Sequence, residues 1–120
     1  MNIEEAREVC LKIKGSIEDF PFGDDVLVYK VMDKMFAYIG LEPKDGDFLL
    51  NLKCDPEKAV ELREKYSGII PGYHSNKKYW NSIILDSDVS DQLIKELVQH
   101  SVDEVIKKLP KSKQEVYKNS

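Results

Sequence analysis

Hydrophobic positions at the start of the chain recur every three or four residues, which is the spacing of a helix that buries one face. Asn2 precedes this run, and Glu5 stands at the third helical position, as in a capping box. Gly15 is placed where such a helix can end. The pattern therefore predicts a first helix between Asn2 and Gly15. The members of its apolar stripe are Ile3, Ala6, Cys10, Ile13 and Ile17.

After residue 25 the hydrophobic pattern changes to short runs rich in β-branched and aromatic residues. Val26–Val31 and Lys34–Ile39 are separated only by Met32 and Asp33, which is the spacing of a tight hairpin. Residues 48–54 then alternate between apolar and polar positions, as a half-buried strand does. These three runs predict an antiparallel meander. Residues 16–25, with a proline, a glycine and several acids, are predicted to form a connecting loop.

The second half of the chain repeats the change from helical to strand periodicity. Asp55 followed by Pro56 is a strong helix start, and Gly68 marks its end. Two strand-like runs follow, at residues 69–73 and 80–85, and Ser90 caps a last helix that Pro110 closes. The predicted order is α-β-β-β-α-β-β-α. Because helices must bury their apolar stripes, we expect a two-layer α+β sandwich with a five-stranded antiparallel sheet and the helices on one face.

Composition is consistent with a single domain over residues 1–120. The chain has 120 residues, 42% hydrophobic residues and a formal net charge of -4. No apolar run approaches the roughly 20 residues that span a bilayer, and the acidic N-terminal residues lack a secretory signal, so we expect a cytoplasmic protein. The charge is uneven, because residues 105–120 hold five basic and one acidic side chain. We therefore expect a basic C-terminal tail at about residues 110–120.

The sequence offers little support for catalysis or a cofactor. It contains no glycine-rich phosphate-binding loop, nucleophile elbow or zinc-protease motif. Cys10 and Cys54 stand far apart at apolar positions, where a free thiol usually behaves as a small buried hydrophobe. His74 and His100 fall in different elements and have no carboxylate at metal-ligating spacing. We therefore expect a non-enzymatic protein without a metal or cofactor.

The segment Gly68–Asn81, GIIPGYHSNKKYWN, concentrates the residues with binding potential. It holds three aromatic rings, a histidine, two lysines and two asparagines, and contains no acid. Lysine and amide groups at a hairpin tip can donate hydrogen bonds to phosphate oxygens, and aromatic rings can stack on bases. From the residues alone a structural explanation is favoured, in which Pro71 and Gly72 shape a bend, Trp80 anchors the sheet to a helix and the lysines keep the tip soluble.

Over about residues 20–110 the sequence resembles the MmcQ/YjbR family of small bacterial proteins. The main match is LKCDPEKAVELREKYSGIIPGYHSNKKYWNSIILD, where the family shows an L-K-C-x-P-E-x-A-x-x-L-R run, then P-G-Y-H, then N-K-x-H-W-N. The PFG at residues 21–23 and the K-x-F-A at residues 34–37 also match. The resemblance implies a two-layer fold similar to type III secretion chaperones.

The same resemblance implies DNA binding through two protruding hairpins, a "double wing". One wing is the hairpin at Met32–Asp33 and the other is the tip at residues 74–78. Tyr79 stands where the family most often has His, and Met32–Asp33 replaces a glycine-rich turn. We expect a regulatory DNA-binding protein with weak, salt-sensitive affinity and a log-log salt slope of about -2 to -4. The expected contact residues are Lys30, Lys34, His74, Asn76, Lys77, Lys78, Tyr79 and Asn81.

Two other functions stay open from the sequence. The acidic pI of about 5.2 is unusual for a DNA-binding domain, and the secretion-chaperone-like fold suggests a protein-interaction module that accepts a segment of a partner. A third hypothesis is an enzyme or small-ligand binder that uses Tyr73, His74 and Lys77 in a cleft. This hypothesis trails the other two on the sequence alone, and a deep apolar pocket beside His74 in the structure would raise it.

Overall fold

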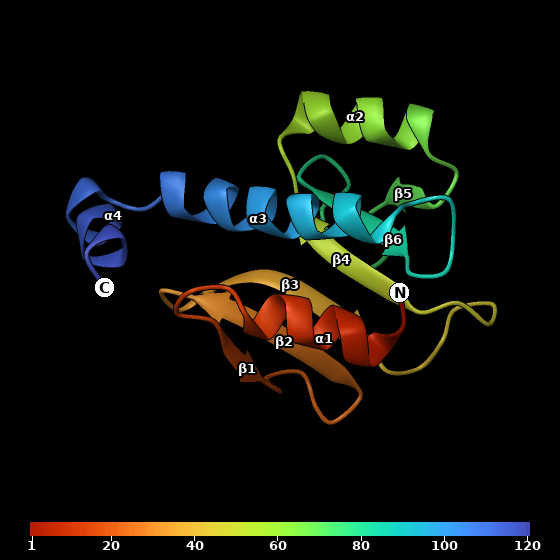
Figure 1. Cartoon of the computed structure of the whole chain (residues 1–120), viewed down its shortest axis with the longest axis horizontal. Helices are drawn as coiled ribbons and strands as arrows, with labels where there is room; N and C mark the ends of the chain where they lie inside the picture. The colour runs from red at the N-terminus through yellow and green to blue at the C-terminus, as the bar shows by residue number, and fades with distance from the viewer.

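The computed structural model describes residues 1–120 and shows one antiparallel sheet with helices packed against it (Figure 1). The predicted α+β fold is confirmed, but the structure has one strand and one helix more than the sequence predicted. The observed order is α-β-β-β-β-α-β-β-α-α. The elements are α1 (Ile3–Leu11), β1 (Ile17–Asp19), β2 (Val26–Val31), β3 (Lys34–Gly40), β4 (Leu49–Lys53), α2 (Pro56–Lys65), β5 (Ile69–Pro71), β6 (Trp80–Ile84), α3 (Asp91–Lys107) and α4 (Lys111–Lys118).

The sheet has six strands in the order β1-β2-β3-β4-β6-β5, and every neighbouring pair is antiparallel. The predicted meander is confirmed as β2, β3 and β4. Met32 and Asp33 form its first turn with φ angles of 50° and 65°, the left-handed conformation that type I′ hairpin turns require at both central residues. After β4 the chain crosses through α2 to the edge strand β5, and β6 then fills the position between β4 and β5.

Strand β1 lies in the segment 16–25, so the prediction of a loop there was wrong. Its pairing places Ile17 opposite Lys30 and Asp19 opposite Val28. The Ile17 side chain, which was predicted to continue the stripe of the first helix, is 60% exposed at this edge. Three residues are too few to show a strand periodicity, so the pairing depends on contacts with residues far away in the sequence.

Glu18 supplies those contacts between β1 and the rest of the molecule. Arg7 of α1 donates two hydrogen bonds to its carboxylate, from Nε at 2.8 Å and Nη2 at 3.0 Å. The Tyr29 hydroxyl of β2 donates a third at 2.8 Å. The hydrogen bond from Arg7 is the largest effect that lowers the pKa of Glu18, and Tyr29 adds to it. Glu18 therefore joins α1, β1 and β2.

The helices begin where the sequence predicted. The Asn2 side chain accepts from the Glu5 amide in a complete capping box, Asp55 accepts from Lys58, and Ser90 accepts from Leu93. The additional helix α4 lies in the predicted basic tail. The Tyr117 hydroxyl donates to the Lys14 carbonyl at 2.8 Å, so α4 is held against the chain that follows α1.

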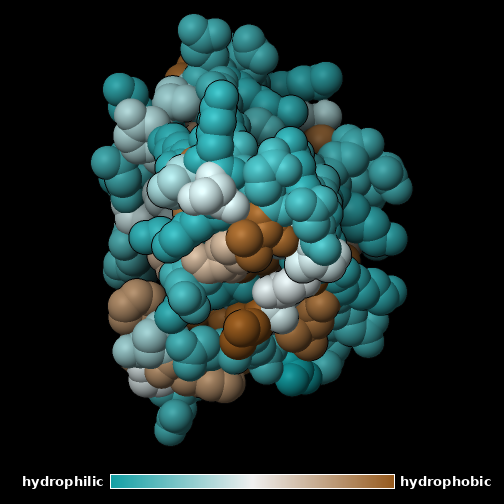
Figure 2. All heavy atoms as spheres, turned by 90° about the vertical axis from the view of Figure 1, so that its left-hand side faces the viewer, coloured by the Kyte–Doolittle hydropathy of each residue, from teal (hydrophilic) through white to brown (hydrophobic).

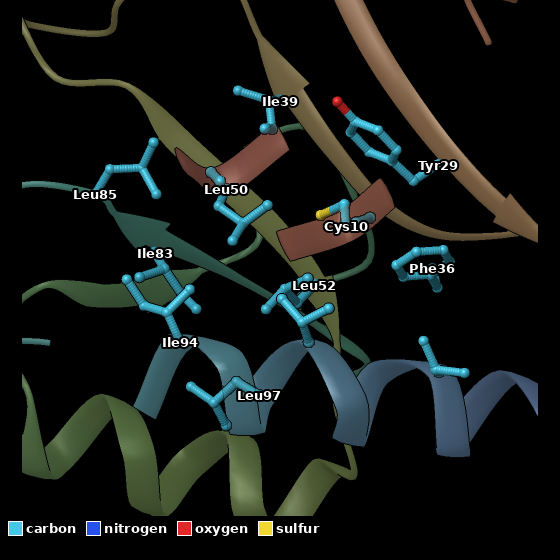
Figure 3. Close-up of a cluster of buried hydrophobic side chains, with 14 of the residues drawn as sticks. Cys10, Tyr29, Phe36, Ile39, Leu50, Leu52, Ile83, Leu85, Ile94 and Leu97 are labelled. Atoms are coloured by element: carbon cyan, nitrogen blue, oxygen red, sulfur yellow. The ribbon is translucent and has the colours of Figure 1, made fainter. Parts of the chain in front are cut away.

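The hydrophobic core lies between the sheet and the helical layer. Figure 3 shows Cys10 of α1 and Ile94 and Leu97 of α3 against side chains from β2, β3, β4 and β6. Phe36 and Ile39 are fully buried there, and each such side chain contributes roughly 1.5–3 kcal/mol to folding. The β-bulge at Tyr29/Lys30 shifts the register, so the adjacent residues Phe36 and Ala37 both enter the core.

The other face of the sheet, which we call the open face, has no helix against it. Because side chains alternate along a strand, Tyr38, Asn51 and Ser82 lie side by side on the open face, between core residues of their strands. None of the four helices combines the length and apolar character that a bilayer span needs.

Candidate nucleic-acid interface

The hairpin of β2 and β3 carries two predicted phosphate contacts, Lys30 and Lys34, and the structure gives them different surroundings. Lys30 Nζ lies 3.2 Å from the Asp19 carboxylate in the next strand, so its charge is already paired. Lys34 is exposed at the start of β3 and forms no ion pair. The hairpin therefore offers one free lysine near its turn, beside the acid Asp33.

The second predicted wing is a loop closed by its own hydrogen bonds. The chain leaves β5 at Pro71 and enters β6 at Trp80. The Gly72 amide donates to the Trp80 carbonyl at 2.9 Å. A side chain at Gly72 would place its Cβ 2.6 Å from Ser75 Oγ and 2.9 Å from Trp80 Cβ. Glycine is therefore required where the two ends of the loop approach each other.

Three of the predicted contact residues hold this loop in place. Lys77 Nζ donates to the Gly72 carbonyl at 2.8 Å. The Asn76 side chain accepts from the Lys78 amide at 2.9 Å. The Asn81 side chain is 3% exposed, accepts from Arg63 Nη1 at 2.9 Å and donates to the Ala59 carbonyl at 3.3 Å. In this conformation the buried Asn81 side chain does not reach a base edge, and the Lys77 ammonium is directed to the backbone of its own loop at Gly72.

Lys78 and Tyr79 instead lie together with a lysine that the sequence analysis did not select. Lys78 Nζ lies 5.3 Å and Lys108 Nζ 4.5 Å from the centroid of the Tyr79 ring. Both distances are within the range of a cation–π interaction. Lys108 is the C-cap of α3, so the end of this helix meets the loop before β6.

Two further lysines complete the group at this end of the sheet. Lys53 closes β4, and the charges of Lys108 and Lys34 act on it. Burial is the largest effect that lowers the pKa of Lys53, followed by repulsion from Lys108, while Glu104 and Tyr79 raise it. We call Lys34, Lys53, Lys78 and Lys108 the basic cluster: Lys78 and Lys108 contact the Tyr79 ring, and the charges of Lys108 and Lys34 act on Lys53.

The basic cluster is not neutralised by acids. None of its four ammonium groups lies within 4.0 Å of a carboxylate, and the nearby Glu104 is paired with Lys107 at 2.6 Å. The side of the molecule that carries α4 and the end of α3 is mostly hydrophilic, with hydrophobic side chains showing in its middle and lower parts (Figure 2). A local positive field of this kind can attract phosphates despite the acidic net charge.

The remaining predicted residue, His74, lies away from the basic cluster. Its ring centroid is 4.2 Å from that of Tyr73, and both residues line a cavity on the open face of the sheet. The structure thus separates the predicted residues into two places. Lys34, Lys78 and Tyr79 belong to the basic cluster, and His74 belongs to the cavity.

The sequence analysis missed Lys53 and Lys108 for different reasons. Lys53 reads as the polar side of a strand, and Lys108 as part of a solvated basic C-terminus. The sequence held one weak signal, the basic run that begins at Lys107 and Lys108 near the end of the predicted last helix. Only the packing of α3 against β4 brings the two together.

Other candidate chemistry is sparse. No group of three or more His, Cys, Asp or Glu side chains is arranged to hold a metal ion. Both cysteines are free and buried. Burial raises the pKa of Cys10 to about 12 and that of Cys54 to about 11, so neither thiol is ionised or reactive near neutral pH.

The fold and this site define a small α+β protein with a basic cluster at one end of an antiparallel sheet. A family model described as YjbR matches residues 11–103, and the chain belongs to this family. The uncharacterised protein YbdF of Escherichia coli O157:H7 is 33% identical over 111 residues, which are 92% of this chain and 89% of YbdF. The uncharacterised protein YjbR of Escherichia coli K12 is 28% identical over 97% of each chain.

Two solved structures share the fold. The crystal structure of Deinococcus radiodurans protein DR2400, with a DUF419 domain, superposes with a TM-score of 0.85 at 38% sequence identity. The match covers 97% of this chain and 87% of DR2400. A protein from Pseudomonas syringae superposes with a TM-score of 0.73 at 26% identity, over 84% of this chain and 96% of that one.

Proposed function

We propose that this protein binds DNA without enzymatic activity, through the phosphate backbone and at the basic cluster, in a regulatory role. The observation that carries the proposal is that Lys78 and Lys108 share one tyrosine ring, while Lys53 and Lys34 add further unpaired charge from the ends of neighbouring strands. Gathering like charges is unfavourable: after burial, which is the largest effect, repulsion from Lys108 also lowers the pKa of Lys53. A bound phosphate would remove that repulsion.

The mode of binding follows from the geometry of the cluster. Lys34, Lys78 and Lys108 are exposed and can contact phosphates. The half-buried Tyr79 ring can stack on an unpaired base once a lysine side chain moves from the ring to a phosphate. The amides of Asn76 and Asn81 are engaged within the protein. This mode therefore supplies little sequence readout, and affinity should be weak, within about 10⁻⁴ to 10⁻⁶ M at physiological salt.

The test is fluorescence anisotropy of labelled single-stranded and duplex DNA, titrated with the full chain at several salt concentrations. Four neutralised phosphates predict a log-log salt slope no steeper than about -4. The informative variant is Lys78→Gln with Lys108→Gln, because Lys77 also holds the loop. Its matched control is Lys111→Gln with Lys113→Gln, which removes the same charge from the exposed face of α4.

We expect the Lys78/Lys108 variant to lose about tenfold or more in affinity and to flatten the slope by about 2. The control variant should change the affinity and the salt slope much less. Equal losses in the two variants would show a diffuse charge effect and contradict a defined site. No saturable binding up to about 0.5 mM protein, which exceeds the weakest Kd expected here, would overturn the proposal. Recovery of a single protein partner after nuclease treatment would then support the interaction-module alternative.

A further inference from the structure

The open face of the sheet carries a cavity of about 480 Å³ that is separate from the basic cluster. Its floor comes from β2, β3 and β4, and its walls from the loops before β2, after β3 and after β5. The volume falls in the range of small-molecule sites. The cavity lining includes three aromatic and three charged residues: Phe22, Tyr38, Tyr73, Asp25, Glu42 and Lys44.

A buried polar network holds the wall of this cavity in place. The Ser82 hydroxyl donates to the Asn51 side chain and accepts from the Tyr73 amide at 3.0 Å. The Tyr38 hydroxyl donates to Ser75 Oγ at 2.9 Å. Asn51 and Ser82 are 4% and 0% exposed. The loop that carries Tyr73 is thus tied to the sheet at two points, and the cavity is preformed.

Aromatic rings border the cavity and remain partly exposed, although His74 and the Lys44 ammonium already contact the Tyr73 ring. Phe22 is 68% exposed and Tyr73 43% exposed, while Tyr38 packs on Trp80 with ring centroids 5.6 Å apart. Large aromatic side chains gain stability by burial. Two exposed rings at one cavity therefore leave a flat apolar surface that a ligand can cover.

The charge around the cavity favours a positive ligand. The Leu41 amide donates to the Asp25 carbonyl at 2.7 Å, which brings the ends of β2 and β3 together and places Asp25 and Glu42 on one rim. Neither carboxylate has an ion-pair or hydrogen-bond partner. Lys44 is the only lysine of the rim, and its Nζ lies 3.4 Å from the Asp45 carboxylate.

The contact between Lys44 and Tyr73 shows that the aromatic wall of the cavity can accept a cation. The Lys44 ammonium lies 4.8 Å from the centroid of the Tyr73 ring, at cation–π distance. We propose that this cavity binds a small organic cation with a flat apolar body, which stacks on Phe22 and Tyr73 and directs its charge to Asp25 and Glu42. Such a ligand differs from DNA in charge and occupies a different surface, so this site is independent of the basic cluster.

The experiment uses amide-resolved NMR of the full ¹⁵N-labelled chain with three probes of similar shape. 1-Methylquinolinium is the cation, quinoline is neutral at pH 7.5, and naphthalene-1-sulfonate is the anion. We expect 1-methylquinolinium to shift the backbone amides of residues 73–75 and the side-chain amide of Asn51 in a saturable way. The cation should bind about tenfold tighter than quinoline, given the size of cation–π and carboxylate interactions.

Two isosteric variants separate charge from shape. Asp25→Asn with Glu42→Gln should reduce the preference for the cation over quinoline to about twofold or less. Glu61→Gln with Glu64→Gln makes the same change in net charge on exposed positions of α2 and should leave the preference intact. Tyr73→Ala should weaken both the cation and quinoline. The dispersion of the amide spectrum shows in each case that the variant is folded.

The proposal fails on any of three outcomes. If no amide shift saturates at about 5 mM cation, any affinity is weaker than millimolar. The cavity is then not a binding site for small organic cations. Equal affinity for all three probes would show an unspecific apolar surface. Tightest binding of the sulfonate would reverse the assignment of charge and identify an anion site at Lys44 and His74.

Discussion

The ammonium of Lys108 lies 4.5 Å from the centroid of the Tyr79 ring, which joins the end of α3 to the loop before β6. This contact sets the geometry of the basic cluster, because Lys78 approaches the same ring at 5.3 Å. Lys53 and Lys34 add charge from the neighbouring strand ends. The two ammonium groups interact with one ring, and both lysines are exposed where phosphates can reach them.

We predict that Tyr79→Ala weakens single-stranded DNA binding by about fivefold or more, since base–aromatic stacking is worth about 1–3 kcal/mol per base. Anisotropy with a short labelled oligonucleotide measures the loss. Tyr73→Ala is the matched control, because Tyr73 is an exposed tyrosine that lines the cavity on the open face. Unchanged affinity in Tyr79→Ala would remove this ring from the interface.

Lys53→Met should raise the stability of the fold while it weakens DNA binding. Burial and the repulsion from Lys108 lower the pKa of Lys53, so its charged form is disfavoured in the folded protein. Removing the charge should raise the melting temperature slightly, by about 2 °C, and weaken DNA binding. Calorimetry and anisotropy on one preparation test both effects. A variant that is less stable, or that binds DNA as well as the wild type, would contradict this account of Lys53.

Asn81→Ala should destabilise the fold without changing the salt dependence of DNA binding. The Asn81 side chain is buried between Arg63 and the Ala59 carbonyl. Its removal leaves Arg63 Nη1 with only the Lys77 carbonyl as acceptor and takes a side-chain donor from the Ala59 carbonyl, which costs about 2 kcal/mol in the free energy of unfolding. Urea denaturation measures this loss, with the exposed Asn119→Ala as control. A flattened salt slope would instead assign Asn81 to the interface.

Ser82→Ala should loosen the loop beside the cavity. The variant leaves the Asn51 side chain and the Tyr73 amide without their buried partner, at a cost of about 1–3 kcal/mol. We expect the Tyr73 amide to exchange with deuterium faster while the amides of the helical layer stay protected. Ser112→Ala, exposed on α4, is the control. Uniformly faster exchange would show global destabilisation without a local role for Ser82.

Stability should fall as the pH drops below about 6.5, because of His100. Its Nε2 accepts a hydrogen bond from the Asp55 amide at 3.2 Å, which requires the neutral ring. Burial, followed by the charge of Lys58, lowers the pKa of His100 below its ordinary value of 6.5. The folded state thus binds the proton less readily than the unfolded state, so stability is lost as the pH falls below 6.5 toward the folded pKa.

Thermal unfolding between pH 5 and pH 8 tests this dependence. His100→Gln places an amide oxygen within reach of Asp55 and should flatten the curve over the range in which histidine titrates. His74→Gln, at an exposed position, should leave it unchanged. A pH dependence that survives in His100→Gln would assign the effect to carboxylates.

Much of the fold could be predicted because its signals are local. The caps at Asn2 and Ser90, the meander of β2 to β4 and the buried thiols follow from neighbouring residues and from periodicity. The candidate site was harder to predict, because a sequence does not show whether a polar side chain faces solvent or the interior. Asn81 illustrates this: its amide reads as a surface donor, yet it is 3% exposed.

The sequence by itself determined the α+β class, the family and the positions at which most elements begin, since capping, turn geometry and hydrophobic periodicity act over a few residues. The tertiary structure alone decided that Ile17–Asp19 pairs as a strand, that Lys53 meets Lys108, and that the open face holds a cavity. These features depend on residues distant in the chain, which come together only when the helices and the sheet bury their common core.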